Sequence, residues 1–276
     1  TLASNTYFVM TDDYRVYKCI GNAKANSTVA AANSTVEPTG TSTSLLSTAD
    51  GYHWKYMYSI STADILKFLT TSYIPVETDS TVSAAASNSS IDHIEVSAAG
   101  SSYLGALGTM ASVSNANTMI LHSSAGTVDG MYTGSSIYIS GGTGSGQVRE
   151  IQSYVGSTRT VRTTIDFGTP PDNTSTYSVG PTVTIKGSRG PKGSPTAASA
   201  YANTVYAANF AATGNTVNKI GVISGGAHFA SANVVLSANA SNGTGATGTP
   251  MIAPPGGHGS NAVSELLGYN VMLNIQ

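Results

Sequence analysis

Apolar and polar residues alternate in short stretches along the chain, and a period of two is the pattern of β-strands. Residues 7–10 and 14–20 alternate in this way on either side of an aspartate-containing turn, which predicts two strands. Residues 21–50 hold almost only small and polar side chains, with a Pro-Thr-Gly turn signal at 38–40. This composition predicts a long surface loop.

The densest aromatic stretch of the chain is residues 50–58. Because side chains of a strand point alternately to opposite faces, its large aromatic residues share one face. They are Tyr52, Trp54, Tyr56 and Tyr58, whereas His53, Lys55 and Met57 fall on the other face. A continuous aromatic face on one strand is more typical of a protein core than of a sugar-stacking platform, so we expect it to be buried.

Residues 61–70 predict a short helix, because Ser61 and Asp64 stand at the spacing of a capping box and apolar residues follow at helical spacing. Between about residues 78 and 90 the composition collapses to Ser, Ala, Thr, Val and Asn. This stretch favours a linker, with a domain boundary near residue 82.

Beyond this boundary the sequence repeats itself. Residues 91–103 align with residues 217–229 at a constant offset, and each copy has a glycine three residues before its final aromatic residue. The alignment predicts a duplicated strand-turn-strand unit. Between the copies, residues 134–140, 147–151 and 182–185 predict short strands separated by Gly-rich turns, as in antiparallel sandwiches or barrels.

The C-terminal part begins with a turn that combines rigid and flexible residues, namely Pro254, Pro255, Gly256, Gly257, His258 and Gly259. Residues 260–267 predict two helical turns with Val263, Leu266 and Leu267 inward and Gly268 as the stop. Residues 269–275 alternate, which predicts a strand that returns to the first unit's sheet.

Together these patterns predict a mainly β fold of antiparallel, sandwich-like sheets with long loops and one or two short helices. We expect a core segment over residues 1–81, an inserted Gly/Ser/Thr-rich β domain over residues 82–250, and a C-terminal segment over residues 251–276 that returns to the core sheet. Because Thr1 is not a methionine, the chain is expected to be part of a longer polypeptide.

Composition narrows the classes of function. Only 9% of the residues are charged, compared with about a quarter in an average soluble domain. The formal net charge of −2 supplies no broad cationic field, and no apolar run approaches the roughly 18 residues that span a bilayer. We therefore expect neither nucleic-acid binding nor membrane insertion. The single cysteine, Cys19, excludes an intrachain disulfide and a thiolate metal cluster.

Candidate chemistry is sparse. The five histidines show no metal-binding spacing, and His258 stands out only because flanking glycines leave its ring exposed. No acidic side chain lies within local reach of it, so a conformational role of the turn is favoured over catalysis. Asp12 and Asp13 fit a turn, residues 141–146 a hairpin turn, and the basic run at 186–192 a solvated loop. We expect no catalytic residue, cofactor or metal.

An ordered succession of motifs carries a resemblance to a known family. The motifs are Tyr14-Arg15-Val16-Tyr17-Lys18-Cys19-Ile20, Ser34-Thr35-Val36-Glu37-Pro38-Thr39-Gly40-Thr41, Thr48-Ala49-Asp50-Gly51-Tyr52-His53-Trp54-Lys55-Tyr56-Met57-Tyr58, Lys67-Phe68, Tyr73-Ile74-Pro75-Val76, the turn at 254–259, Glu265-Leu266 and Tyr269-Asn270-Val271-Met272. They resemble the baseplate wedge subunit of T-even-like contractile-tailed phages that forms a homodimer, in its cyanophage and marine myovirus version. The resemblance covers roughly the first 76 and the last 25 residues. The family's N-terminal region is absent, and residues 82–250 look like a Gly-rich β insertion.

The resemblance implies a structural virion protein of the tail baseplate that is assembled in the bacterial host cytoplasm. Such a protein is mostly β, forms a homodimer, and holds neighbouring wedge proteins together during assembly and contraction. Other baseplate wedge proteins are the implied partners, and neither a cofactor nor a catalytic residue is implied. The core or assembly motif would consist of Asp50, Gly51, Tyr52, Trp54, Tyr56 and Tyr58, together with the turn at 254–259.

Two other classes of function remain open. One is a tail fibre or decoration protein that binds host-surface carbohydrate through exposed tyrosines of the insertion. The other is a polysaccharide lyase or hydrolase on a β scaffold, which ranks last because the sequence displays no constellation of carboxylates.

Overall fold

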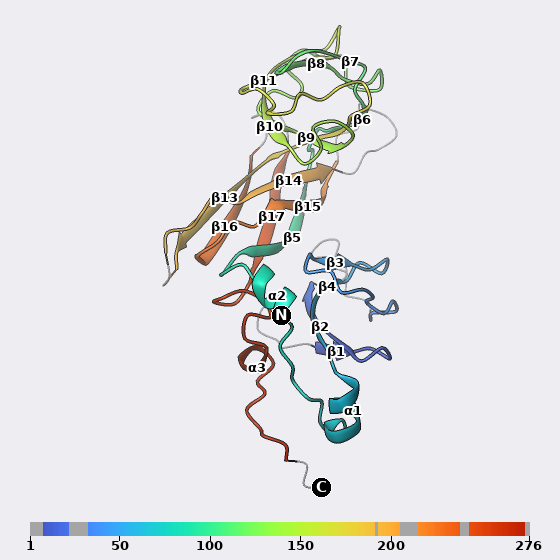
Figure 1. Ribbon diagram of the computed structural model, residues 1–276. Coiled ribbons are helices and arrows are strands. Elements are labelled where there is room, and N and C mark those ends of the chain that lie inside the picture. The colour runs from blue at the N-terminus through green and yellow to red at the C-terminus, as the bar shows by residue number, and fades with distance from the viewer. Residues whose placement is uncertain (1–7, 22–32, 191–192, 205–214, 238–242, 274–276) are drawn as a thin grey trace.

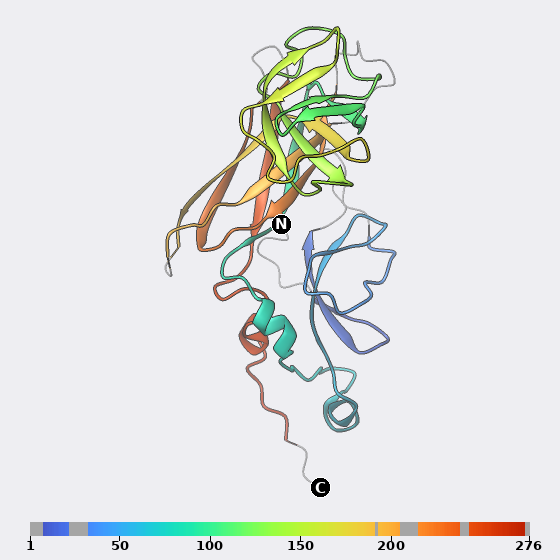
Figure 2. The same ribbon diagram turned by 45° about the horizontal axis from the view of Figure 1, so that its top comes forward.

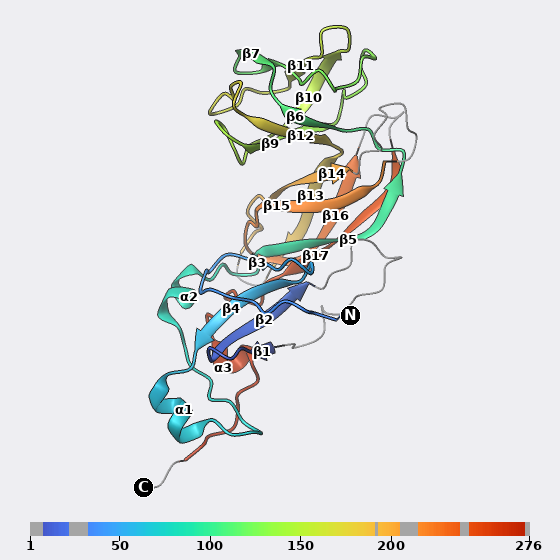
Figure 3. The same ribbon diagram turned by 90° about the vertical axis from the view of Figure 1, so that its right-hand side faces the viewer.

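The computed structural model describes residues 8–21, 33–190, 193–204, 215–237 and 243–273. The protein is mainly β, with 45% strand and 7% helix, which confirms the predicted fold class. Its strands form three antiparallel sheets that follow one another along a long axis (Figure 1 and Figure 3). The sheets are curled, and the described residues contain three short helices, one more than the upper number expected.

The first sheet has four strands in the order β1-β2-β4-β3. They are β1 (Phe8–Met10), β2 (Arg15–Gly21), β3 (Leu46–Ser47) and β4 (His53–Ser59). The predicted N-terminal strands and the aromatic strand are therefore confirmed, and Tyr7 lies outside the described residues. The predicted loop at 21–50 is corrected at two places, because Gly21 ends β2 and Leu46–Ser47 form β3, which pairs with β4. Residues 33–45 contain neither helix nor strand, and residues 22–32 are outside the described part of the chain.

The first helix, α1 (Thr62–Phe68), lies where it was predicted, and Ser61 caps it by accepting from Asp64 N. The second, α2 (Ser80–Ala85), falls where a linker was predicted. Asp79 caps it by accepting from two backbone N–H groups, and Val82 is buried against the aromatic core of the first sheet. The boundary predicted near residue 82 thus falls inside a helix that belongs to the first sheet.

The second sheet has six strands in the order β13-β16-β17-β5-β15-β14. They are β5 (Ile91–Ser101), β13 (Thr182–Arg189), β14 (Ser199–Thr204), β15 (Val217–Ser224), β16 (Phe229–Ser237) and β17 (Thr244–Ile252). The two end strands, β13 and β14, also contact each other, so the sheet curls. Residues 186–189 belong to β13, which corrects the prediction of a basic loop; residues 191–192 lie outside the described chain.

The predicted duplication supplies the centre of the six-stranded sheet. Strands β5 and β15 pair antiparallel with Ile94 opposite Ile220, which are equivalent residues of the two copies. In each copy the glycine adopts a left-handed backbone, with φ +62° at Gly100 and +57° at Gly226. The two copies thus share this pairing and this backbone conformation, as a local twofold axis between them requires.

The same axis relates the other strands of this sheet. Strand β17 pairs with β5 as β14 pairs with β15, and β13 pairs with β16. Tyr103 N donates to Asn215 O at 3.0 Å, and the equivalent Phe229 N donates to Ser89 O at 3.1 Å. Each copy thus contributes three strands, β5-β13-β14 from the first and β15-β16-β17 from the second.

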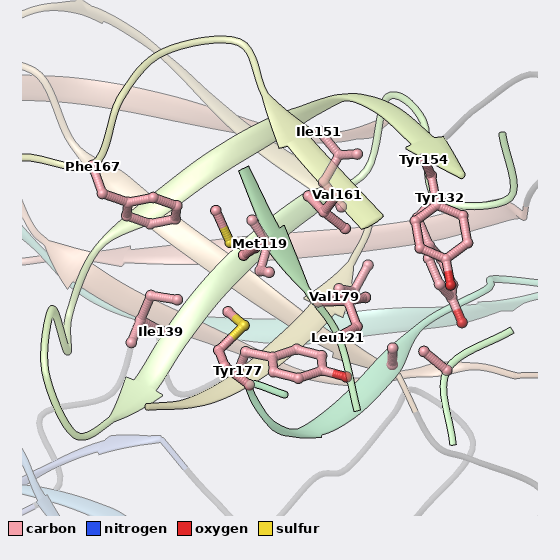
Figure 4. Packing of buried hydrophobic residues seen from close by; sticks show 14 residues of the cluster. Met119, Leu121, Tyr132, Ile139, Ile151, Tyr154, Val161, Phe167, Tyr177 and Val179 are labelled. Atoms are coloured by element: carbon pink, nitrogen blue, oxygen red, sulfur yellow. The ribbon is translucent and has the colours of Figure 1, made fainter. Parts of the chain in front are cut away.

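The third sheet is inserted into the first copy, between β5 and β13. Its order is β6-β12-β9-β10-β11-β8-β7, and it curls around its own apolar core (Figure 2 and Figure 4). The strands are β6 (Ala106–Thr109), β7 (Ser112–Asn115), β8 (Thr118–Ile120), β9 (Ser136–Gly141), β10 (Val148–Val155), β11 (Thr160–Thr163) and β12 (Thr176–Gly180). Residues 141–146 form a hairpin connection between β9 and β10, as predicted.

The C-terminal segment returns to the first sheet as a helix and not as a strand. Helix α3 (Ala262–Glu265) places Ala262 and Leu266 against the apolar residues of β2 and β4. Val263 and Leu267 are exposed, which corrects their predicted inward orientation. Residues 269–273 form no strand, because no strand of the first sheet pairs with them, and residues 274–276 lie outside the described chain.

Candidate functional site at the joint between the first two sheets

The aromatic face predicted on β4 is buried, as expected. Tyr52, Trp54, Tyr56 and Tyr58 are each at most 9% exposed. The rings of Tyr52 and Trp54 stack with centroids 5.7 Å apart. Tyr17 of β2 meets Tyr56 edge-on. These rings form a core and leave no stacking surface for a sugar.

Asp50, just before the aromatic strand, holds the preceding loop in place. Its carboxylate accepts hydrogen bonds from the backbone N–H groups of Thr35 and Val36 and from the hydroxyls of Ser34 and Thr48. These hydrogen bonds, led by the one from Thr48, lower the pKa of Asp50 well below its ordinary value. The residue therefore has a structural role, and Gly51 beside it turns the chain with φ +86°.

The turn at 254–259 packs against the segment that leads from α2 into β5. Gly256 N donates to Asn88 Oδ1 at 2.7 Å, and Ser89 N donates to Pro254 O at 3.3 Å. A Cβ atom on Gly257, whose φ is +91°, would lie 2.5 Å from Ser87 N. Only glycine allows the two segments to approach this closely.

His258 is buried inside this turn, which corrects the prediction of an exposed ring. Its side chain is 5% exposed, and both ring nitrogens face carboxylates. Nδ1 contacts Glu265 Oε1, and Nε2 lies 3.0 Å from Asp92 Oδ2. The acidic partners that the sequence did not reveal come from α3 and from β5. Asp92 Oδ2 has no aligned hydrogen-bond donor among the described residues, so this contact is mainly an attraction between charges.

Two lysines complete the cluster, which we call the charge cluster (Lys18, Lys55, Asp92, His258 and Glu265). Lys18 Nζ of β2 lies 2.7 Å from Glu265 Oε1. Lys55 Nζ of β4 lies 3.5 Å from Asp92 Oδ1. The charge cluster thus joins the first sheet, the six-stranded sheet and the C-terminal segment at one place.

The charges in this cluster shift one another's pKa values. Burial lowers the pKa of His258, but the carboxylates of Asp92 and Glu265 outweigh burial, and the pKa rises above its ordinary value. Burial raises the pKa of Glu265, but His258 and Lys18 outweigh it and bring the pKa to about 2. His258 is therefore favoured as an imidazolium and Glu265 as a carboxylate.

A cavity of about 40 Å³ adjoins the charge cluster and is lined in part by Lys55, Ser90, Asp92 and His258. A cavity of this size holds about one to three water molecules and admits no sugar or peptide. Ordered water there would supply the donor that Asp92 Oδ2 lacks. The arrangement can hold protons and fix segments, but it has no space for a substrate.

A pair of histidines lies near the charge cluster, between the same two sheets. The rings of His53 on β4 and His93 on β5 have centroids 4.2 Å apart. Burial, aided by the nearby charge of Lys219, lowers the pKa of both, that of His93 to about 3. This pair is therefore neutral near pH 7, in contrast to His258.

A larger groove lies at the opposite end of the first sheet from the six-stranded sheet. Its volume is about 680 Å³, and it is formed by α1, residues 72–77 and the C-terminal segment. The lining residues are Phe8, Asp64, Phe68, Ser72, Tyr73, Ile74, Pro75, Val76, Glu77, Val263, Leu266, Leu267, Gly268, Asn270, Val271 and Met272. Beside it, Leu66, Val271 and Leu273 are each more than 80% exposed. We call it the apolar groove, because most of its lining side chains are apolar.

Sequence reasoning identified the aromatic face and the turn but missed Lys18, Asp92 and Glu265. One signal was available. In a chain with only 9% charged residues, Lys18 and Asp92 stand inside apolar strand patterns. Charged residues at such positions are rarely buried without a partner, so they pointed to buried ion pairs.

Among the described residues, no group of three or more His, Cys, Asp or Glu side chains is arranged so that it could hold a metal ion, and no helix is long and apolar enough to cross a membrane. Comparison with known proteins does not indicate a function, because no family model, curated protein or solved structure matches the chain.

Proposed function

We propose that the protein is a structural component of a contractile phage tail, a baseplate wedge subunit that holds neighbouring wedge proteins together during assembly and contraction. One observation carries the proposal. The two segments that resemble this family, near the two ends of the chain, are joined by the Lys18–Glu265 ion pair and by the packing of Ala262 on β2 and β4. They form one body although an insertion separates them, as the resemblance requires.

The apolar groove is the proposed docking surface for a neighbouring wedge protein. It is built from residue 8, residues 64–77 and residues 263–272, which lie almost wholly in the segments that carry the resemblance. Its lining includes the carboxylates of Asp64 and Glu77 and no basic residue. The complementary occupant is an apolar segment of the neighbour that carries a lysine or arginine.

The protein is further proposed to act as a homodimer, with no cofactor and no catalytic activity. The resemblance supports the homodimer and implies neither a cofactor nor a catalytic residue. Sedimentation equilibrium of the purified chain tests the dimer, since a monomer at micromolar concentration would contradict it.

Carbohydrate binding through tyrosines of the insertion is the weaker candidate. Tyr103, Tyr132, Tyr154 and Tyr177 are each at most 3% exposed. Tyr138 and Tyr201 are half-buried and stack on each other, with ring centroids 3.8 Å apart. The described tyrosines of the insertion are therefore either buried or stacked on each other, and Tyr206 lies outside the described chain.

Immunogold electron microscopy of phage particles, purified from bacteria in which the protein is produced, tests the proposal. An antibody against the exposed β13 strand should label the baseplate of intact tails and remain there after contraction. Labelling of fibre tips would favour the carbohydrate-binding candidate. Absence of the protein from purified particles would contradict both.

A further inference from the structure

Two chain segments connect the first sheet to the six-stranded sheet, and they run side by side. Residues 86–90 lead from α2 into β5, and residues 253–257 lead from β17 back to the first sheet. Ala253 N donates to Ser90 O at 2.8 Å, in addition to the contacts of Gly256 and Ser89 described above. We call this double connection the joint; side chains that cross it also hold the two sheets together.

The charge cluster lies directly beside the joint and bridges it. Asp92 is the second residue of β5, whereas Lys18, Lys55 and Glu265 belong to the body of the first sheet and α3. His258 lies between the two carboxylates, with one ring nitrogen toward each. It is therefore one link between the two sheets, beside the Lys55–Asp92 ion pair and the contact of His53 with His93.

The two carboxylates beside the ring favour a proton on each ring nitrogen. A neutral imidazole carries only one N–H, so one of its nitrogens would present a lone pair to a carboxylate. In a side chain that is 5% exposed, water cannot relieve this repulsion. The contacts observed on both sides are favourable only for the imidazolium.

We propose that His258 is a proton-dependent latch that fixes the six-stranded sheet on the first sheet when protonated and releases it when deprotonated. Among the described residues, the charged or titratable groups that face it are Asp92 of β5, Glu265 of α3, Lys18 of β2, and Lys55 and Tyr56 of β4. The two carboxylates favour the proton and the two lysines oppose it.

The sign of the pH dependence follows from these contacts. The pKa of His258 in the folded protein lies above its ordinary value of 6.5. The stabilisation is therefore fully present below pH 6.5 and is lost as the pH rises through the folded pKa. Between the ordinary pKa of 6.5 and the raised pKa of His258 in the folded protein, the equilibrium constant for opening the latch increases tenfold for each pH unit.

Pulsed electron paramagnetic resonance on the whole chain tests the latch. Spin labels at Thr41→Cys, beside the first sheet, and Asn233→Cys, on β16, report the distance between the two sheets. The native Cys19 stays unlabelled, because its thiol is buried and its pKa is raised to about 11. We expect a narrow distance distribution at pH 6 and a broad one at pH 9. A distribution that is equally narrow at both values would overturn the proposal.

Two variants separate the latch from a general loss of structure. His258→Gln should give a broad distribution at both pH values, with the strand signal in circular dichroism retained. Glu265→Gln removes one carboxylate that raises the pKa of His258, so the midpoint of broadening should move to lower pH. His122→Gln changes an exposed histidine of the third sheet and should behave as the unmodified protein. An unmoved midpoint in Glu265→Gln would contradict the latch even if His258→Gln failed to fold.

Discussion

Asp92 faces two cationic side chains at the joint, and its own side chain is 9% exposed. A buried carboxylate of this kind is balanced by its partners. Removing its charge leaves Lys55 without an anion and leaves His258 with Glu265 alone. We expect Asp92→Asn to lower the free energy of unfolding by about 3 kcal/mol, measured by urea denaturation at pH 6.5.

Asp13→Asn is the matched control for this change. Asp13 pairs with Arg15 at 3.0 Å, but its side chain is 68% exposed. Because exposed ion pairs contribute little, its free energy of unfolding should change by less than about 0.5 kcal/mol. Similar losses for the two variants would mean that the charge cluster does not stabilise the fold.

Burial of His93 should make the folded protein less stable in acid. Its pKa is lowered from 6.5 to about 3, first by burial and then by the charges of His53 and Lys219. The unfolded chain therefore takes up the proton at higher pH than the folded chain, and stability falls as the pH drops below 6.5. Between pH 6.5 and pH 4.5 the loss due to this group should be about 2 kcal/mol.

The contribution of His93 is read from the difference between the unmodified protein and His93→Gln, which removes the titrating group. Urea denaturation across pH 4.5 to 7 should give a flatter profile for this variant. His122→Gln should retain the full slope. Parallel profiles for the unmodified protein and His93→Gln would show that the histidine pair is not buried as described.

At the residue scale, the sequence pattern predicted those features that depend only on residues close together in the chain. The burial of Trp54 and Tyr56 follows from a period of two within one strand. The environment of His258 could not be found in this way. Its partner Asp92 is distant in sequence, and Glu265 reaches it only because α3 folds back over the turn.

At the scale of elements, the duplicated unit depends on its two left-handed glycines. A Cβ on Gly100 would lie 2.5 Å from Thr244 O, and one on Gly226 would lie 2.5 Å from Thr196 O. Alanine at either position therefore combines backbone strain with a clash against a neighbouring backbone. We expect Gly100→Ala and Gly226→Ala each to cost about 3 kcal/mol of unfolding free energy.

Gly40→Ala separates these two contributions. Gly40 also has a left-handed backbone, with φ +87°, but a Cβ added there would meet no other part of the chain within 4 Å. This variant should cost only about 1 kcal/mol in the same urea titration. Equal costs at Gly40, Gly100 and Gly226 would contradict the close packing of the repeat.

The errors at this scale have physical causes. Four of the six residues of helix α2 are Ser, Thr or Val, which have weaker helical preference than alanine. The helix is fixed by the Asp79 cap and by the packing of Val82. Residues 269–273 alternate like a strand but have no strand to pair with. A strand needs a neighbour, and sequence patterns alone do not supply one.

At the scale of the whole molecule, the predicted insertion contains two units, one nested in the other. The third sheet has its own core of buried residues, including Tyr132, Ile139 and Tyr177 (Figure 4). By contrast, the six-stranded sheet depends on β5, which lies between β17 and β15. The sequence did not reveal that one unit is inserted into the other, because the Gly-rich turns of both units have the same composition.

This difference predicts which fragments fold alone. Residues 104–181 contain the third sheet and its whole core and should show a cooperative thermal transition by circular dichroism. Residues 182–252 lack β5 and should show none. A cooperative transition in residues 182–252 would contradict the division into units. So would the lack of such a transition in residues 104–181.

The central claim is that the end of the molecule with the apolar groove docks onto neighbouring tail proteins. Cross-linking mass spectrometry of intact phage particles with an amine-reactive reagent tests it most directly. Lys67 is exposed on α1 beside the groove, and Lys186 is exposed on β13, beyond the joint. We expect cross-links from Lys67 to another baseplate protein. Cross-links between proteins from Lys186 alone, or particles without this chain, would contradict it.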